Sequence, residues 1–292
     1  MLMGRFREAL KSVPYSKYVA SLVRSRYSPS TGWYSWLRDA NAKVTRTSFF
    51  DLDSIAWYIT PTNQRIALES LDDLDTTSDV FMGGHYDRMN REAKPGSVVW
   101  DIGANIGAAS LIFAQNPNVT HVYSYEPMPH TFSWTQRTLN GNPALSPKID
   151  VQNLGIGSSQ RDLEISYTRK AKCAIGLSEI PERLRTRYDI QPEDMEQITI
   201  HLADADQVLS AIRSRHPDAP ILLKLDAEGA EYEVINRLAE TGGLHELAAA
   251  AIEWHLEPGK EYLTSRLQSA GFQTAIHELE PDGSIGMIDA WR

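Results

Sequence analysis

Charged side chains of both signs crowd the segment "KLDAEGAEYE", which begins at Lys224. The apolar run 221–225 is typical of a buried strand, so Lys224 and Asp226, two residues apart, are expected on one face near its carboxyl end. Glu228 and Glu231 follow at a spacing of one helical turn. Lys224 can offset part of the repulsion among these carboxylates, and we expect Glu228 or Glu231 to orient it. A carboxylate with like-charged neighbours has a raised pKa, which suits proton transfer. The alternative for Glu231 is an acid that stabilises a helix N-terminus.

The next apolar run, "LAAAAIEWHLEP", places Glu253 and His255 on one face at a neighbouring strand end. His255 is the first candidate for a general base, because the ordinary pKa of histidine lies near neutrality. Asp226 and Glu253 are candidates for binding substrate hydroxyls. They could instead ligate Mg2+, which takes carboxylate oxygens, although we favour a site without a metal. A purely structural role for His255 is the alternative.

A glycine-containing turn follows the apolar run "SVVW", at the point where a parallel sheet binds its ligand. Gly103 and Gly107 allow a tight turn and a close approach to the main chain, and Asp101 opens the turn with a carboxylate suited to an ammonium group. Glu126 ends the next apolar run, where a carboxylate can accept hydrogen bonds from both hydroxyls of a ribose. Ammonium, carboxylate and ribose together indicate S-adenosylmethionine. The alternative is a turn with ordinary strand-end acids.

The motifs "DIGANIG", "YEP", "LGIG" and "LLKLDAEGAEYEVI" resemble the FkbM family of S-adenosylmethionine-dependent methyltransferases. The resemblance covers about residues 97–256, and its last motif is the most specific. It implies the seven-stranded class I methyltransferase fold. It also implies O-methylation, commonly of hydroxyls on sugars, glycosides or polyketide-type natural products.

The resemblance assigns contacts with the cofactor to three groups of residues. The cofactor loop would consist of Asp101, Gly103, Ala104, Asn105 and Gly107. The ribose would be held by Glu126 with Pro127, and the adenine would lie near Gly155, Ile156 and Gly157. Asp226 is a further candidate for contact with the cofactor. The region near the adenine has no obvious acid, because Asp162 lies too far along its strand.

The elements that must position these residues follow from the pattern of apolar runs. From residue 97 onward, runs of four to six apolar residues alternate with helix-period segments, which predicts an α/β fold with a doubly wound parallel sheet. Near the end of the chain, two strand-like runs joined by Pro-Asp-Gly predict an antiparallel hairpin. A long polar insertion at 167–198 interrupts the alternation, and we expect a flap over the site or an oligomer contact there.

Three regions are expected along the chain: a helical arm over 1–48, lead-in strands with an acidic loop "LDDLDTTSDV" over 49–96, and the methyltransferase domain over 97–292. The arm holds nine Lys or Arg residues against two acids, although the whole chain carries a net charge of −9. Such an arm could touch a membrane surface, a nucleic acid or an anionic substrate. The alternative is an arm that packs on its own acidic body or on a second copy of the chain, which would make a homo-oligomer. The acidic body argues against long nucleic acids, whose affinity depends on phosphate contacts.

Composition narrows the remaining possibilities. The longest uncharged apolar stretch is too short to cross a bilayer and the first residues are charged, so we expect a cytoplasmic protein. The lone Cys173 excludes an internal disulfide and a thiolate zinc site. The aromatic side chains of Trp33, Trp57 and Tyr58 are candidates for stacking on a substrate, and a place in the hydrophobic core is the equal alternative for them.

These observations predict a small-molecule O-methyltransferase that uses S-adenosylmethionine. Three alternatives remain at this point: an RNA ribose methyltransferase, a noncatalytic assembly module that keeps the cofactor fold, and a nicotinamide oxidoreductase.

Overall fold

The computed structural model describes most of the chain after the expected arm. The described residues are 48–52, 55–60, 62–172, 182–255, 258–280 and 282–292. The arm expected over 1–48, apart from its last residue, lies outside them, and so do Trp33 and Cys173.

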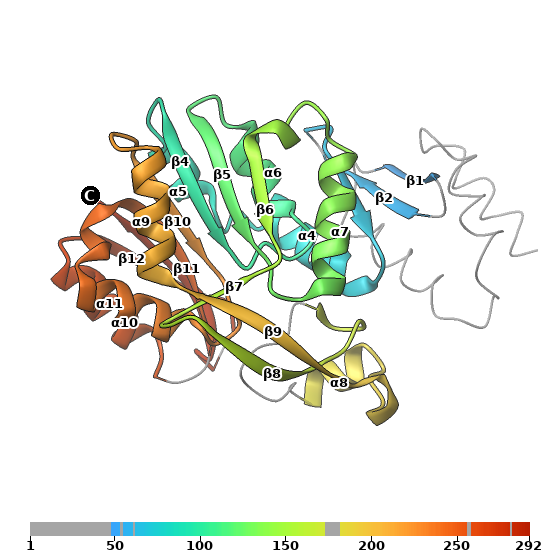
Figure 1. Cartoon of the computed structure of the whole chain (residues 1–292). Helices are drawn as coiled ribbons and strands as arrows, with labels where there is room; N and C mark the ends of the chain where they lie inside the picture. Colours follow the sequence, from blue (N-terminus) through green and yellow to red (C-terminus); the bar gives the residue numbers. More distant parts are fainter. Residues whose placement is uncertain (1–47, 53–54, 61, 173–181, 256–257, 281) are drawn as a thin grey trace, which may run out of the picture.

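A seven-stranded sheet forms the centre of the described structure (Figure 1). In spatial order its strands are β12 (Gln273–Glu278), β13 (Ile285–Trp291), β11 (Leu247–His255), β10 (Ile221–Leu225), β4 (Ser97–Ile102), β5 (Val119–Tyr125) and β6 (Ile149–Gln152). Only β13 runs against the others, and it forms the expected terminal hairpin with β12. The prediction of a class I methyltransferase fold is therefore confirmed. The chain leaves β4 toward β6 and returns at β10 on the other side, so the ligand-binding switch point lies between β4 and β10.

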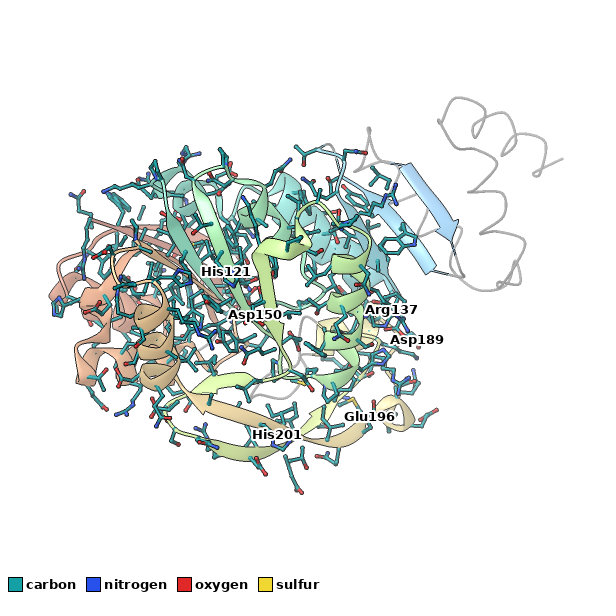
Figure 2. All side chains as sticks on the ribbon, turned by 45° about the horizontal axis from the view of Figure 1, so that its top comes forward. His121, Arg137, Asp150, Asp189, Glu196 and His201 are labelled. Carbon is teal, nitrogen blue, oxygen red and sulfur yellow. The ribbon has the colours of Figure 1, made fainter. Side chains whose placement is uncertain are left out.

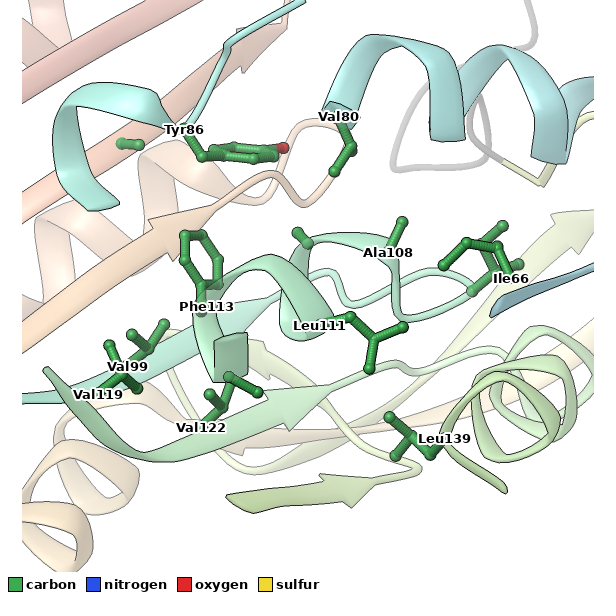
Figure 3. Close-up of a cluster of buried hydrophobic side chains, with 14 of the residues drawn as sticks. Ile66, Val80, Tyr86, Val99, Ala108, Leu111, Phe113, Val119, Val122 and Leu139 are labelled. Atoms are coloured by element: carbon green, nitrogen blue, oxygen red, sulfur yellow. The ribbon is translucent and has the colours of Figure 1, made fainter. Parts of the chain in front are cut away.

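Helices cover both faces of this sheet. One face carries α4 (Leu71–Met82), α5 (Asp87–Glu92), α6 (Ala108–Gln115) and α7 (Pro129–Asn140), and the other carries α9 (Ala205–Arg215), α10 (Glu231–Thr241) and α11 (Lys260–Ser269). Successive residues of β4 alternate between the two cores, with Val99 packed toward α6 and Val98 toward α9. Figure 3 shows Val99 and Val122 beside Leu111 and Phe113 of α6. Burial on both faces explains why the strands read as continuous apolar runs.

Among the described residues, no helix is both long enough and apolar enough to span a membrane.

The lead-in segment contains the expected strands and one unexpected helix. β1 (Ser48–Leu52), β2 (Ile55–Ile59) and β3 (Arg65–Leu68) form an antiparallel sheet. The acidic stretch expected as a loop is helix α4, which corrects that prediction. Its physical basis is a capping box, in which Ser70 accepts from the Asp73 N–H and the Asp73 side chain accepts from the Ser70 N–H. Leu74 and Val80 then bury the apolar side of the helix.

Two aromatic residues of the lead-in segment belong to the core. Trp57 is 7% exposed and Tyr58 is 0% exposed, and both pack in the cluster that includes α6 and α7. Neither side chain offers a surface for stacking on a substrate, so that expectation is corrected. Consecutive side chains of a strand point to opposite faces, so β2 is covered on both faces at this point.

A third sheet, also of three strands, precedes α9. It consists of β7 (Gly155–Gly157), β9 (Glu196–Asp204) and β8 (Arg161–Tyr167) in that order, and Figure 2 shows His201 of β9 at the margin of the molecule. Between β8 and β9 lies α8 (Glu182–Arg187), and short 3-10 helices cover Ser146–Lys148, Pro192–Asp194 and Gly243–Glu246. The described part of the insertion at 167–198 thus continues this sheet. Its role as a flap or an oligomer contact stays a prediction.

Lys172, just after β8, fastens the insertion to the lead-in segment. Its side chain is 0% exposed, and its Nζ lies 2.9 Å from a carboxylate oxygen of Glu69 and 2.9 Å from one of Asp73. His130 of α7 contacts the same Glu69 carboxylate at 2.7 Å. Burial alone would lower the pKa of Lys172, but the two carboxylates outweigh it and the pKa is raised. Three segments distant in sequence therefore meet at one buried cation.

Removing the charge of Lys172 should destabilise the fold. We expect Lys172→Met to lower the free energy of unfolding by about 3 kcal/mol or more, because the buried carboxylate of Asp73 loses its partner and the partly buried Glu69 is left with His130. Lys170→Met is the matched control: its Lys–Asp194 pair is 40% and 26% exposed, so the loss should stay below about 1 kcal/mol. Urea unfolding of both variants measures the difference, and equal losses would contradict a buried role for Lys172.

Candidate active site

The glycine turn between β4 and α6 owes its sequence to close contact with β10. Gly103 has a φ of +80°, and a Cβ there would lie 1.7 Å from the main-chain oxygen of Asp226. Asn105 and Gly107 also have positive φ, at 48° and 85°. The N–H groups of Gly103 and Ala104 donate to the Tyr125 carbonyl at 3.0 and 2.9 Å. These bonds hold the turn against the end of β5.

Asp101 differs from its expected role. Its side chain is 0% exposed, so its carboxylate does not face a ligand ammonium. Ser110 of α6 and Ser124 of β5 donate to its Oδ2, and Lys224 Nζ lies 3.4 Å from its Oδ1. The buried charge of Lys224 draws the carboxylate inward, because an unpaired buried ammonium is unfavourable. Asp101 therefore ties β4 to its neighbours.

Glu126 directly follows β5 and contacts the glycine turn. Its side chain accepts hydrogen bonds from the Asn105 N–H at 2.9 Å and the Met128 N–H at 3.0 Å. Burial raises the pKa of Glu126 to about 7, although both hydrogen bonds act in the opposite direction. An ionised carboxylate has about four acceptor positions, so two more hydrogen bonds can be accepted.

The residues expected near an adenine lie beside this carboxylate. Gly155, Ile156 and Gly157 form β7, and a Cβ on Gly155 would lie 3.2 Å from the Pro127 side chain. The turn, Glu126 and β7 are thus brought together at the carboxyl ends of β4, β5 and β6. This edge is the one at which open α/β sheets bind ligands.

Lys224 is buried at the carboxyl end of β10 and joins this strand to β4. Its Nζ donates to the carbonyls of Ile102, at 3.2 Å, and Gly103, and it lies 3.5 Å from an oxygen of Asp226. Burial would lower the pKa of Lys224, but Asp226 and Asp101 raise it further than burial lowers it. Lys224 is therefore a fixed cation at neutral pH.

The expected orientation of Lys224 by a glutamate is corrected. Glu231 is 0% exposed and contacts His255 Nδ1 at 3.1 Å, and Glu228 lies 3.4 Å from His255 Nε2. The two glutamates flank the turn at Gly229, and both contact His255 of β11 and not Lys224, which faces β4.

Tyr86 is a site residue that the sequence did not reveal. It precedes α5, and its hydroxyl donates to Asp226 Oδ2 at 3.3 Å although the two residues are 140 positions apart. Its ring lies 5.8 Å from Lys224 Nζ. Burial and the nearby Asp226 carboxylate raise its pKa well above the usual range, so the hydroxyl keeps its proton and stays a donor. The sequence around Tyr86 contains no motif that predicts this contact.

His255, at the end of β11, is enclosed by carboxylates. Glu231 accepts from its Nδ1 and is itself held by two main-chain N–H groups of the preceding turn. On the other side, Nε2 lies 3.4 Å from Glu228 and 3.6 Å from Glu253. Burial would lower the pKa of His255, but these three carboxylates raise it well above its ordinary value. The imidazole is therefore a cation at neutral pH, unlike the near-neutral base expected from its residue type.

The two glutamates that face Nε2 are also perturbed. Burial raises the pKa of Glu228 to about 8 and raises that of Glu253 well above the usual range. Glu228 has a φ of 51°, a left-handed conformation that costs a non-glycine residue on the order of 1 kcal/mol or more. Strain of this kind gathers at functional sites.

Metal-ligating atoms also come together here, in a different set from the expected pair. Oxygens of Asp226 and Glu228 and a nitrogen of His255 all lie within 4.8 Å of one another. Glu253, expected to share a cation with Asp226, stands beside this set and contacts His255.

The close contact at Gly103 can be tested by adding one methyl group. We expect Gly103→Ala to lower the free energy of unfolding by at least about 2 kcal/mol, because the new Cβ would overlap the Asp226 carbonyl. Gly96→Ala is the control, since Gly96 has a φ of +88° and nothing within 4 Å of the added Cβ. Its loss should be about 1 kcal/mol, from the backbone conformation alone. Equal losses in thermal or urea unfolding would show that β4 and β10 can separate easily at this point.

The chain is similar to several proteins that are named as methyltransferases. The hexuronic acid methyltransferase AglP of Haloferax volcanii is 28% identical over 191 residues, which cover 65% of this chain and 70% of AglP. The methyltransferase sdnD of Sordaria araneosa is 26% identical over 235 residues, or 73% of this chain and 88% of sdnD. The crystal structure of methyltransferase FkbM from Methylobacillus flagellatus matches with 16% identity and a TM-score of 0.43, covering 76% of this chain and 54% of that one.

The sequence model of the methyltransferase FkbM domain matches residues 101–274, more than half of the chain. This range begins at the acid that opens the glycine turn and contains Glu126, Lys224 and His255. The chain therefore belongs to the FkbM family of methyltransferases.

Proposed function

We propose that this methyltransferase uses S-adenosylmethionine to methylate a hydroxyl group of a sugar, glycoside or natural-product scaffold. The observation that carries the proposal is the position of Glu126, which touches the glycine turn through the Asn105 N–H at 2.9 Å. A carboxylate at this strand end suits the two hydroxyls of a ribose. The name of AglP, which acts on a hexuronic acid, supports a sugar-like acceptor.

The residues at the switch point fit such a cofactor. Glu126 has acceptor positions beyond the two that the main chain uses, and β7 places Gly155–Gly157 beside Pro127. Asp101 would act indirectly, by holding Lys224 and the end of β4 in place. When bound, S-adenosylmethionine supplies an electrophilic methyl group on a sulfonium.

The acceptor hydroxyl would bind at the cluster around His255. Asp226 and Glu253 are 24% and 18% exposed, so both carboxylates reach the surface of the site and can accept hydrogen bonds from hydroxyls. The proton of the reacting hydroxyl would pass to the carboxylate of Glu253, and His255, 3.6 Å away, would position that carboxylate and balance its charge. Methyl transfer needs this proton removal together with in-line positioning.

Cofactor affinity should depend on the ionisation of Glu126. Its pKa of about 7 means that the carboxyl is protonated at lower pH and must lose that proton to accept two ribose hydrogen bonds. We expect the Kd for S-adenosylhomocysteine, measured by calorimetry, to rise by up to about tenfold per pH unit below pH 7 and to level off above it.

Glu126→Gln should weaken binding about 10- to 100-fold at pH 8 and should remove the pH step, since charged hydrogen bonds are lost. Glu164→Gln, at an exposed position on β8, is the control and should leave both unchanged. Wild-type binding that is strong but independent of pH would remove Glu126 from the ribose site. No binding at all would overturn the choice of cofactor.

Turnover should require His255. We expect His255→Ala to lower kcat by at least about a hundredfold with an accepted substrate, because positioned acid-base groups supply that much. His245→Ala, at an exposed position, should keep wild-type kcat. A loss of less than about tenfold in His255→Ala would exclude His255 from the proton-transfer group.

A further inference from the structure

Two carboxylates and one imidazole come close together at the ends of β10 and β11. Asp226 follows β10 directly, Glu228 lies two residues further in the strained turn, and His255 ends β11. Their two oxygens and one nitrogen lie within 4.8 Å of one another. Ligands of one cation at about 2.1 Å from it stand at most about 4.2 Å apart, so small rotations of side chains would bring all three into range.

The orientation of His255 favours a ligand at its Nε2. The imidazole side chain is 8% exposed, and Glu231, which is 0% exposed, binds its Nδ1 at 3.1 Å. A carboxylate behind a histidine in this way fixes the tautomer and direction of a metal-binding imidazole. The nearest carboxylate oxygens to Nε2 are 3.4 and 3.6 Å away, longer than an ordinary hydrogen bond. Nε2 is therefore aimed at a polar group that it does not reach.

Charge at this point is unbalanced. Lys224 faces Asp101 and the carbonyls of the β4 end, so it compensates one side of Asp226 only. Glu228 and Glu253 stand on the other side with His255 as the cation that contacts them both. Carboxylates withdrawn from water are favourable only when they are paired or coordinate a metal.

We propose that Asp226, Glu228 and His255 bind a divalent transition-metal cation, Mn2+ or Zn2+ in preference to Mg2+. Two carboxylates with one imidazole match these ions, whereas Mg2+ prefers oxygen ligands and keeps several waters. Three protein ligands leave coordination positions for a water or for hydroxyls of a substrate. The proposal goes beyond methyl transfer, because it rests on these side chains and not on the cofactor.

The test is titration of the full chain, stripped with a chelator, with Mn2+ followed by electron paramagnetic resonance. We expect one site with a Kd below about 100 µM that Zn2+ displaces and that Mg2+ at tenfold excess does not. Pulsed measurements should show coupling to an imidazole nitrogen. Absence of binding below millimolar Mn2+, or binding without nitrogen coupling, overturns the proposal.

Variants separate coordination from simple attraction to negative charge. His255→Gln removes a cation, so an ion held by charge alone would bind as tightly or more tightly, and that result overturns the proposal. Loss of a ligand should instead weaken Mn2+ binding at least about tenfold, and Glu228→Gln should do the same. The matched control is Asp162→Asn, which removes the carboxylate 2.7 Å from the exposed His201 and should leave Mn2+ binding unchanged. Figure 2 labels His201, at the margin of the molecule.

A parallel titration of the same samples with S-adenosylhomocysteine checks folding and keeps the two proposals distinct. Mn2+ binding without cofactor binding would refute the proposed cofactor and support the cation site. The reverse result would refute the cation site alone. His255→Gln or Glu228→Gln protein that still binds the cofactor is folded, so its loss of Mn2+ binding is a local effect.

Discussion

The contact of Lys224 with the ends of two strands is the interaction on which the site depends. Its ammonium lies between Asp101 of β4 and Asp226 of β10 and donates to the carbonyls of Ile102 and Gly103. Breaking a buried pair of this kind costs about 3–5 kcal/mol, because the remaining charge stays buried. The two strand ends lie so close together here that residue 103 must be a glycine, since no Cβ fits beside the Asp226 carbonyl. One buried cation thus fixes the switch point from which the glycine turn starts.

Asp226 connects this structural pair to the chemistry beyond it. One of its oxygens faces Lys224 and also accepts from Tyr86, and the residue is close enough to Glu228 and His255 to share a ligand with them. The charges therefore divide into two groups: a buried one around Lys224, and a partly exposed one around His255. A buried cation with fixed partners thus lies beside glutamates whose pKa values are raised, an arrangement that suits proton transfer.

Sequence pattern predicted the parts of this protein that local physics determines. Apolar runs and turn residues gave the parallel sheet and its terminal hairpin, and Glu126 followed from its place at a strand end. Helix α4 was missed because acidic and hydroxyl residues resemble a loop in composition, although Ser70 and Asp73 have the spacing of a capping box. The partners of His255 and Lys224 could not be assigned, because the turn at Gly229 decides which glutamate faces which strand.

Tyr86 shows why the substrate is harder to infer than the fold. It precedes the range 101–274 that the family model matches, yet its hydroxyl donates to Asp226 at 3.3 Å. The lead-in segment that carries it is fastened to the insertion by Lys172, which contacts Glu69 and Asp73. The charged cluster around Asp226 is therefore assembled in part from a segment that precedes the matched range. Because function depends on the side chains of a site and not on the fold alone, a relative's acceptor does not transfer to this chain without the side chains that the lead-in segment supplies.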